Sequence, residues 1–271
     1  MAKVLVVTSG KGGVGKTTST AAIGAALAQA GQKVVVVDFD VGLRNLDLVM
    51  GAERRVVFDL INVVQGVAKL PQALIRDKRL ENLWLLPASQ TRDKDALTEE
   101  GIGRIVDELR TSYDWIICDS PAGIERGATL AMRFADEAVI VTNPEVSSVR
   151  DSDRIIGMLD SKTVRAERGE QVKKHILITR YDAARASRGE MLSIEDVLDI
   201  LATPLLGIIP ESQDVLRASN VGSPVTLNNP ASTPARAYID ATRRLLGETV
   251  AMTVPVERAG LMNRLLGRRA A

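Results

Sequence analysis

Short runs of apolar, mostly β-branched residues alternate along the chain with longer stretches of helical period. The apolar runs predict strands at residues 3–8, 33–38, 83–86, 115–119, 138–142, 175–179 and 205–209. The longer stretches predict, among others, helices at residues 16–30, 193–201 and 234–246. Because the strands are apolar throughout, we expect both faces of the sheet to be covered. The order of the elements predicts an α/β fold with a doubly wound, mostly parallel sheet.

The same pattern predicts one large domain followed by a short separate segment. No internal repeat is visible, and the polar stretch at residues 161–174 predicts a loop rather than a domain boundary. We therefore expect a domain at residues 1–247, a linker at residues 248–255 and a distinct tail at residues 256–271. No apolar run approaches the roughly 18 residues that a membrane span needs, and the N-terminus does not read as a secretory signal.

Composition narrows the possible chemistry. With 45% hydrophobic and 25% charged residues, the chain has the balance of a globular protein, which excludes disorder as its main state. One cysteine and one histidine exclude a disulfide scaffold and a Cys/His zinc site, and leave only His175 for a Ser-His-Asp triad. The net charge of +1 provides no overall field for holding nucleic acid. The cysteine count favours a reducing, intracellular location.

A phosphate-binding loop joins the first predicted strand to the first predicted helix. Residues 10–17 read G-K-G-G-V-G-K-T, which fits G-x-x-x-x-G-K-[ST] in the structural context that the motif requires. Glycines allow backbone N–H groups to turn toward a phosphate, and the helix adds its positive dipole end. The expected nucleotide-binding residues here are Gly10, Lys11, Gly12, Gly13, Val14, Gly15, Lys16, Thr17 and Thr18. Lys16 would reach the β and γ phosphates, and the Thr17 hydroxyl would bind Mg²⁺.

Three carboxylates follow predicted strands near this loop. Asp38 and Asp40 come at the end of the second strand, where ligands bind in open α/β sheets, although they could also serve only as loop caps. Asp119 ends the apolar run W-I-I-C-D and is followed by S-P-A-G. This is a Walker B pattern, so we expect Asp119 to hold Mg²⁺ through a water or through the Thr17 hydroxyl.

Lys11 is an additional cation inside the phosphate loop. It is either solvated or reaches the phosphates of a nucleotide on a partner subunit, as an arginine finger does. The string G-K-G-G-V-G-K-T-T resembles the deviant Walker A family of dimerising ATPases. The resemblance implies that Lys11 crosses a dimer interface, that Asp40 positions and activates the attacking water, and that Asp38 helps to organise Mg²⁺. On this basis Lys11, Lys16 and Asp40 are the expected catalytic residues and ATP the expected nucleotide.

Family members close the adenine pocket with residues near the ends of the last strands, which implies roles for Arg180 and Pro210. The family's most recognisable version has an asparagine near position 179 or 180, and this sequence lacks it. The iron-protein branch of the family is excluded, because a cluster shared by two subunits needs four cysteines and Cys118 is the single one in this chain.

The tail combines apolar and basic residues at helical spacing. Its apolar face consists of Leu261, Met262, Leu265 and Leu266, flanked by Arg264 and Arg268. Four arginines against one glutamate make the tail basic and leave the rest of the chain slightly acidic. This pattern is typical either of a C-terminal helix docked on the body or of an interfacial anchor on anionic lipid.

Longer segments resemble the septum-placement branch of the family. They include V-G-L-R-N-L-D-L-V-M-G at 41–51, C-D-S-P-A-G-I-E at 118–125 and T-N-P-E-V-S-S-V-R-D-S-D-R at 142–154. The resemblance implies an ATP-dependent homodimer that docks through its tails on the cytoplasmic face of the inner membrane. It also implies recruitment of the division inhibitor MinC and stimulation by MinE, with no specific nucleic acid. Residues 147–154 are the expected contact for both proteins, or otherwise only a solvated helix start.

Three other functions stay open at this stage. A partition-type ATPase would bind DNA through a basic surface, against which the slightly acidic body argues. A related ATPase that places cell poles or flagella would share the same motifs. A nucleotide-dependent adaptor without hydrolysis would lack the carboxylates, so Asp40 and Asp119 argue against it.

Overall fold

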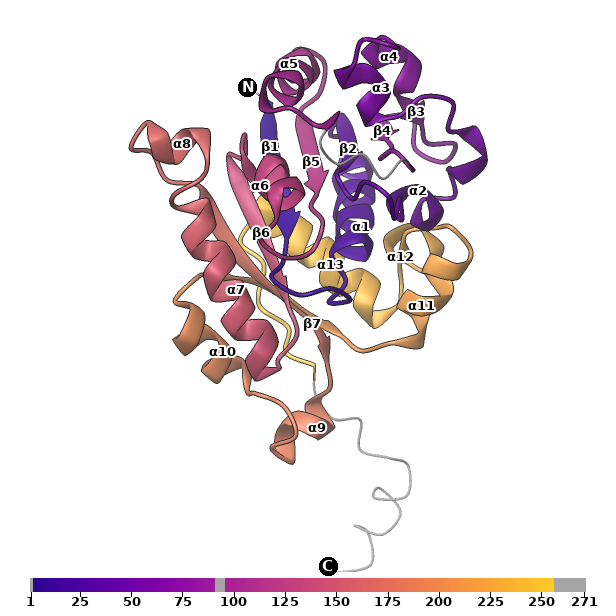
Figure 1. The fold of residues 1–271 in the computed structure, drawn as a ribbon. Coiled ribbons are helices and arrows are strands. Elements are labelled where there is room, and N and C mark those ends of the chain that lie inside the picture. The colour runs from indigo at the N-terminus through magenta and orange to yellow at the C-terminus, as the bar shows by residue number, and fades with distance from the viewer. Residues whose placement is uncertain (1, 91–95, 256–271) are drawn as a thin grey trace, which may run out of the picture.

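The computed structural model describes residues 2–90 and 96–255, which contain one eight-stranded sheet (Figure 1). The strands are β1 (Lys3–Thr8), β2 (Val34–Asp38), β3 (Ile75–Arg76), β4 (Leu83–Leu86), β5 (Trp115–Asp119), β6 (Glu137–Thr142), β7 (Lys173–Tyr181) and β8 (Leu205–Pro210). Their order across the sheet is β3-β4-β2-β5-β1-β6-β7-β8. Neighbouring strands are parallel except for the antiparallel pair β3–β4. The carboxyl ends of β1, β2 and β5 therefore lie side by side at one edge.

Helices cover both faces of this sheet. One face carries α1 (Lys16–Gln29), α12 (Val225–Asn228) and α13 (Thr233–Leu245), and the other carries α3 (Leu60–Val64), α5 (Glu99–Arg110), α6 (Arg126–Met132), α7 (Val146–Leu159) and α10 (Ile194–Leu201). The remaining short helices are α2 (Leu46–Val49), η1 (Glu53–Arg55), α4 (Leu70–Ala73), α8 (Val164–Glu167), α9 (Ala183–Ser187) and α11 (Gln213–Asn220). The result is a three-layer arrangement with the sheet in the middle.

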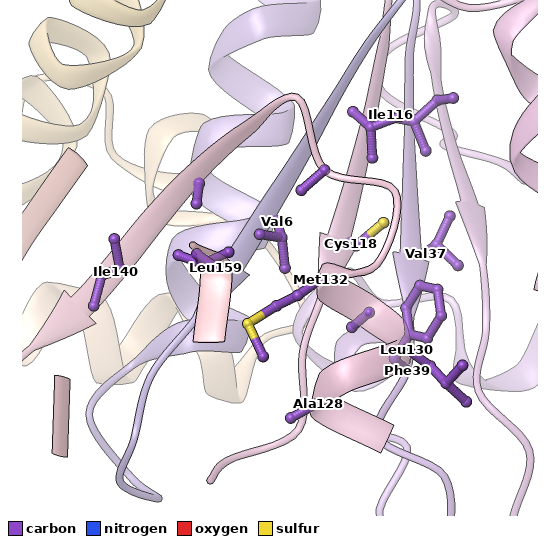
Figure 2. Packing of buried hydrophobic residues seen from close by; sticks show 14 of the residues in the cluster. Val6, Val37, Phe39, Ile116, Cys118, Ala128, Leu130, Met132, Ile140 and Leu159 are labelled. Atoms are coloured by element: carbon purple, nitrogen blue, oxygen red, sulfur yellow. The ribbon is translucent and has the colours of Figure 1, made fainter. Parts of the chain in front are cut away.

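Alternate residues of each strand enter two separate hydrophobic cores. In β1, Val4 and Val6 belong to the core under α5, α6 and α7, whereas Leu5 and Val7 belong to the core under α1 and α13. Figure 2 shows the first core, where Val6 and Cys118 of the sheet lie near Met132 of α6. Because both faces of the sheet are buried, the side chains on either face must be apolar. This accounts for the uninterrupted apolar runs in the sequence.

Helix α1 is buried on nearly all sides and therefore differs from an amphipathic surface helix. Its alanine-rich sequence lets it pack closely between the sheet and α13. A Cβ at Gly24 would lie 2.8 Å from Val36 Cγ1, so the absence of a side chain there permits the close approach of α1 to β2. This packing fixes the first turn of α1 at the carboxyl-end edge of the sheet.

The structure confirms the predicted fold class and contains each predicted strand and helix within a few residues of its expected bounds. It differs at two places. β3 is a two-residue antiparallel strand that was not predicted. The stretch expected to be a loop at residues 161–174 contains the short helix α8 and the first residues of β7. Among the described residues, no helix is long and apolar enough to cross a membrane.

Candidate nucleotide-binding site

A cavity of about 620 Å³ opens at the carboxyl ends of the central strands. Its walls come from the phosphate loop, the start of α1, the loop and helix after β2, the loop after β5, and the ends of β7 and α11. The residues on its walls include Gly12, Gly13, Gly15, Lys16, Thr17, Thr18, Asp40, Asn45, Leu48, Pro121, Ala122, Arg180 and Ser219. Segments far apart in the sequence thus form one site of a size suited to a small-molecule ligand.

The phosphate loop has backbone conformations that favour glycine. Gly13 and Gly15 have φ angles of 75° and 99°, in the left-handed region. Gly15 is also the N-cap of α1, and because glycine has no side chain it cannot cap the helix itself. The first N–H groups of α1 therefore point toward the cavity as donors for an anion. At position 10 a side chain is excluded by lack of space, since a Cβ there would lie 2.4 Å from Asp151 Cβ on α7.

Lys16 lies buried in this cradle. Its Nζ donates to Ser9 Oγ at 3.0 Å, and the Ser9 hydroxyl donates in turn to the carbonyl of Lys11 at 2.7 Å. Burial lowers the pKa of Lys16, against the opposing attraction of Asp119 and Asp40. A desolvated ammonium group in this position gains strongly from a phosphate, because the phosphate replaces the lost hydration.

Asp38 and Asp119 are register partners on β2 and β5, and both are fully buried. Burial raises the pKa of Asp119 to about 6, although hydrogen bonds with Thr17 and Thr20 act in the opposite direction. Burial, together with repulsion from Asp119, raises the pKa of Asp38 well above its usual range. Two buried carboxylates at paired positions of neighbouring strands favour a cation beside them.

The two carboxylates have different contacts. Asp119 Oδ1 accepts a hydrogen bond of 2.9 Å from the Thr20 hydroxyl. The oxygens of Asp38 accept from the backbone N–H groups of Asp40, at 2.8 Å, and Leu46, at 3.3 Å. Asp38 thereby shapes the loop that carries Asp40, and its role in organising a metal ion stays a prediction.

The site fits a magnesium ion that arrives with a nucleotide. The described residues contain no group of three or more His, Cys, Asp or Glu side chains arranged to hold a metal ion. Mg²⁺ is usually bound by one or two protein oxygen ligands together with phosphate oxygens and waters. Thr17 on the cavity wall and the buried Asp119 are oxygen donors of this kind. They would hold the ion, with Asp38 beside them.

Lys11 has surroundings opposite to those of Lys16. Its side chain is 42% exposed, and its Nζ lies 3.0 Å from Glu145 Oε2 and 3.3 Å from Ser147 Oγ at the start of α7. Among the residues that the structure describes, those lining the cavity do not include Lys11. The head group therefore points away from the chain's own phosphate site, and action across a dimer interface stays a prediction.

Of the two residues expected near adenine, one lines the cavity. Arg180 lies on the cavity wall and has a φ of 53°, in the left-handed region. Pro210, at the end of β8, pairs in register with Tyr181 and is not among the cavity residues that the structure describes. Contact of Arg180 and Pro210 with a base stays a prediction. Thr179 instead lies behind the phosphate loop and donates to the Val14 carbonyl at 2.6 Å.

Sequence reasoning missed three supporting residues, namely Ser9, Thr20 and Thr179. Thr20 had a usable signal, since it follows Lys16 by four positions and so shares its face of α1. Ser9 directly precedes the first glycine of the motif. Thr179 had no local signal, because its contact with Val14 joins positions that are distant in sequence.

Two predicted contact regions have different outcomes. Residues 147–154 lie within α7, close to the phosphate loop. The tail residues Leu261, Met262, Arg264, Leu265, Leu266 and Arg268 lie outside the described residues.

A phosphate loop between a central parallel strand and a helix, with a carboxylate at the end of the adjacent strand, defines a P-loop nucleotide-binding protein. The CobQ/CobB/MinD/ParA nucleotide binding domain family matches residues 5–225. The septum site-determining protein MinD of Escherichia coli K12 is 62% identical over 270 residues, which cover 98% of this chain and 100% of that protein. MinD of Neisseria meningitidis serogroup B is 60% identical over 271 residues, with coverages of 98% and 100%.

Solved structures agree with these relatives. The chain superposes on the MinC:MinD cell division protein complex of Aquifex aeolicus with a TM-score of 0.84 and 44% identity, covering 94% of this chain and 100% of that chain. For MinD of Pyrococcus horikoshii, complexed with Mg-ADP, the TM-score is 0.79 and the identity 32%, with coverages of 90% and 96%. The chain belongs to the MinD/ParA family of nucleotide-binding proteins and, within it, to the septum site-determining MinD proteins.

Proposed function

We propose that this chain is an ATPase that places the division septum. ATP joins two subunits into a dimer, the dimer binds the cytoplasmic face of the inner membrane through its tails, and hydrolysis releases it. On the membrane the dimer recruits the division inhibitor MinC, and MinE stimulates turnover. The identity of 60–62% with MinD proteins over nearly the whole chain supports this reading over a DNA-binding partition ATPase or an ATPase that places cell poles or flagella.

The observation that carries the proposal is the opposite placement of the two lysine side chains. Lys16 lies inside the cavity with Asp40 on the same wall, whereas the Lys11 head group lies outside it. Lys16 binds the phosphates of its own nucleotide, and the Asp40 carboxylate orients the attacking water. Lys11 exchanges Glu145 for the phosphates of the nucleotide on the partner subunit, so that hydrolysis needs a dimer.

The supporting groups act through position and charge. The N–H groups of the phosphate loop and the start of α1 hold the phosphates in line with the water that Asp40 orients. A bound Mg²⁺ neutralises charge on the phosphate oxygens. Thr17 and Asp119 orient that ion, and Asp38 holds the loop in which Asp40 lies.

The start of α7 is the proposed contact for MinC and MinE. Lys11 pairs with Glu145 and Ser147 there, so loss of these contacts on dimerisation would change the surface around residues 147–154. The MinC:MinD complex of Aquifex aeolicus supports MinC as a partner of this family. MinE, the lipid surface and the division into a domain, a linker and a tail belong to the proposal.

One set of sedimentation experiments separates the candidate functions. The full chain is mixed with ATP·Mg²⁺ and either anionic vesicles or duplex DNA, and purified MinC is added to each mixture. We expect the chain to sediment with vesicles and to carry MinC with it, and MinE to raise ATP turnover. The Lys16→Ala variant, which lacks the cation in the phosphate cradle, is the matched control. It should neither sediment with vesicles nor carry MinC with it. Sedimentation with DNA in place of vesicles would favour the partition-type function.

A further inference from the structure

The segment that precedes the tail is attached to the body. Helix α13 ends at Leu245, and Gly247, with a φ of 91°, reverses the chain. The N–H of Glu248 then donates to the carbonyl of Arg243 at 3.0 Å. The expected linker at residues 248–255 therefore begins with a defined turn.

Arg244 joins this segment to β8, an outer strand of the sheet. Its Nη1 donates to the Leu206 carbonyl of β8 at 2.7 Å. Its Nε and Nη2 donate to the carbonyls of Val250, at 3.0 Å, and Ala251, at 2.6 Å. One planar guanidinium thus links three backbone carbonyls, two of which belong to the segment. A lysine has the same charge but lacks this fork of donors.

The clamp also determines where the segment goes. Leu206 lies near the beginning of β8, so α13 ends at the edge of the sheet opposite the nucleotide cavity. In Figure 1 the segment, in yellow, turns back after α13 and runs toward the end of the molecule where α9 lies. Because α9 follows the carboxyl end of β7, this is the edge that holds the cavity.

We infer that Arg244 is a positioning residue for membrane attachment, which fixes the point where residues 256–271 leave the body at the nucleotide edge of the sheet. The inference rests on the proposed role of the tail as a membrane anchor. Without the clamp, the tether between body and tail grows from residues 252–255 to residues 249–255, because the N–H of Glu248 still donates to the carbonyl of Arg243. Since effective concentration falls roughly as the −3/2 power of tether length, the second tail of a dimer would insert about twofold less readily.

The first test measures the clamp itself and needs no membrane. Cys118 is the single cysteine of the chain and is buried, so an Ala251→Cys variant, which keeps the clamped backbone carbonyl, can carry one spin label at the segment. We expect Arg244→Ala and Arg244→Lys to raise the mobility of this label, because alanine has no donor and lysine has its donors on one nitrogen rather than on a planar fork that reaches three carbonyls. Arg243→Ala, which removes an exposed ion pair with Glu248, is the matched control and should leave mobility unchanged. Equal mobility in the Arg244 variants and the parent would overturn the inference.

The second test measures the consequence. With ATP·Mg²⁺ and anionic vesicles, Arg244→Ala should need about two- to threefold more lipid for half-maximal sedimentation, as the tether argument gives. Its ATP turnover without vesicles should equal that of the parent, which shows that the body is folded. A five-residue Gly/Ser insertion between residues 255 and 256 should weaken vesicle binding similarly while the label at position 251 stays immobile. Unchanged vesicle binding in both variants overturns the positioning role. If deletion of residues 256–271 leaves vesicle binding intact, the proposed anchor fails, while the label still reports on the clamp.

Discussion

Lys11 and Lys16 lie five positions apart in one loop and have opposite surroundings. Lys16 is desolvated among polar groups of the cradle, whereas Lys11 is half-exposed and paired with Glu145. The motif pattern predicts which lysine belongs to the phosphate site, because the spacing to the glycines and to α1 is local. The partner of Lys11 depends on how α7 packs against the loop, so the sequence could not indicate it.

Asp40→Ala should separate binding from chemistry. The side chain lies on the cavity wall, while the phosphate cradle is built by other residues. We expect nucleotide affinity and ATP-dependent dimerisation to stay within a few-fold of the parent and hydrolysis to fall by at least about 100-fold, since positioned groups contribute on this order. Single-turnover hydrolysis and nucleotide titration measure the two effects. A variant that no longer binds ATP would show that Asp40 is structural.

Lys11→Ala should give a different pattern. Its head group lies outside the cavity, so the isolated subunit should still bind nucleotide. If Lys11 acts across the interface, the ATP dimer and hydrolysis are both lost. Size-exclusion chromatography with ATP tests this directly, using Asp40→Ala as a dimerising control. Dimer formation by the Lys11 variant contradicts the role across the interface.

Glu137 gives a prediction at low pH. Its carboxylate lies 2.9 Å from Lys3 Nζ and 3.4 Å from His175 Nε2. Burial alone would raise the pKa of Glu137, but the interactions of its carboxylate with His175 and Lys3 outweigh burial and lower the pKa from 4.5 to about 2. A depressed carboxylate pKa stabilises the fold above the unfolded pKa, and this stabilisation is lost as pH falls from about 4.5 toward 2.

The stabilisation from Glu137 amounts to about 3 kcal/mol at neutral pH, since one pKa unit corresponds to about 1.4 kcal/mol. Urea unfolding should therefore show Glu137→Gln to be less stable by about this amount at pH 7, with a difference that shrinks below pH 4. Glu100→Gln, at a side chain 86% exposed, is the control. A difference that stays constant with pH would rule out the charge as its cause.

At the scale of elements, two glycines bring the segment after α2 against the loop between α11 and α12. A Cβ on Gly222 would lie 2.8 Å from Gly51 Cα and 3.1 Å from the Leu48 carbonyl, with φ at 64°. Arg79 spans the contact, donating to the carbonyls of Met50 and Gly222 at 2.9 and 3.1 Å. The joint holds together two walls of the cavity, since Leu48 lies on α2 and residue 219 on α11.

Gly222→Ala should therefore cost about 1–3 kcal/mol of stability and also weaken nucleotide binding, because α11 must move away from α2. Gly66→Ala is the matched control. Gly66 has a φ of 73°, and no described atom comes within 4 Å of an added Cβ. This control should lose stability through strain alone, without a change in nucleotide affinity. Equal effects of the two substitutions on affinity would contradict the coupling through the joint.

Elements differ in how well the sequence predicts them. β5 is a run of five buried residues, which is typical of a covered strand, and its bounds were predicted correctly. β3 is two residues long and exists because it pairs with β4, so no local pattern marks it. Pairing between distant segments also explains why the contact of Thr179 with the phosphate loop was not predicted.

At the scale of the whole molecule, the sheet collects the nucleotide site at one edge and, through Arg244, directs the segment before the tail toward the same edge. The order of strands and helices was enough to predict the class of fold. The return of residues 248–255 along the body was not predictable, because it depends on backbone carbonyls rather than on side-chain pattern.

The last prediction concerns how ATP controls membrane attachment. The sequence of one tail offers four large apolar side chains, each worth about 1.5–3 kcal/mol if fully buried and less at an interface. Ordering the backbone costs roughly 1–2 kcal/mol per residue, and each arginine near anionic lipid contributes about 1 kcal/mol. A single tail should therefore bind weakly. Two tails on one dimer gain avidity of about 10²–10⁴, because the second insertion is intramolecular.

Attachment should accordingly follow the number of tails rather than any change within the tail. We expect sedimentation with anionic vesicles in ATP·Mg²⁺ and little in ADP. Deletion of residues 256–271 or Leu265→Glu should abolish it, and high salt should weaken it by screening the arginines. Lys11→Ala provides the matched control, because it keeps the tail but is expected to remain a monomer. A tail that binds equally in ADP and ATP would contradict control by valency, since the dimer would then add nothing to the affinity of its parts.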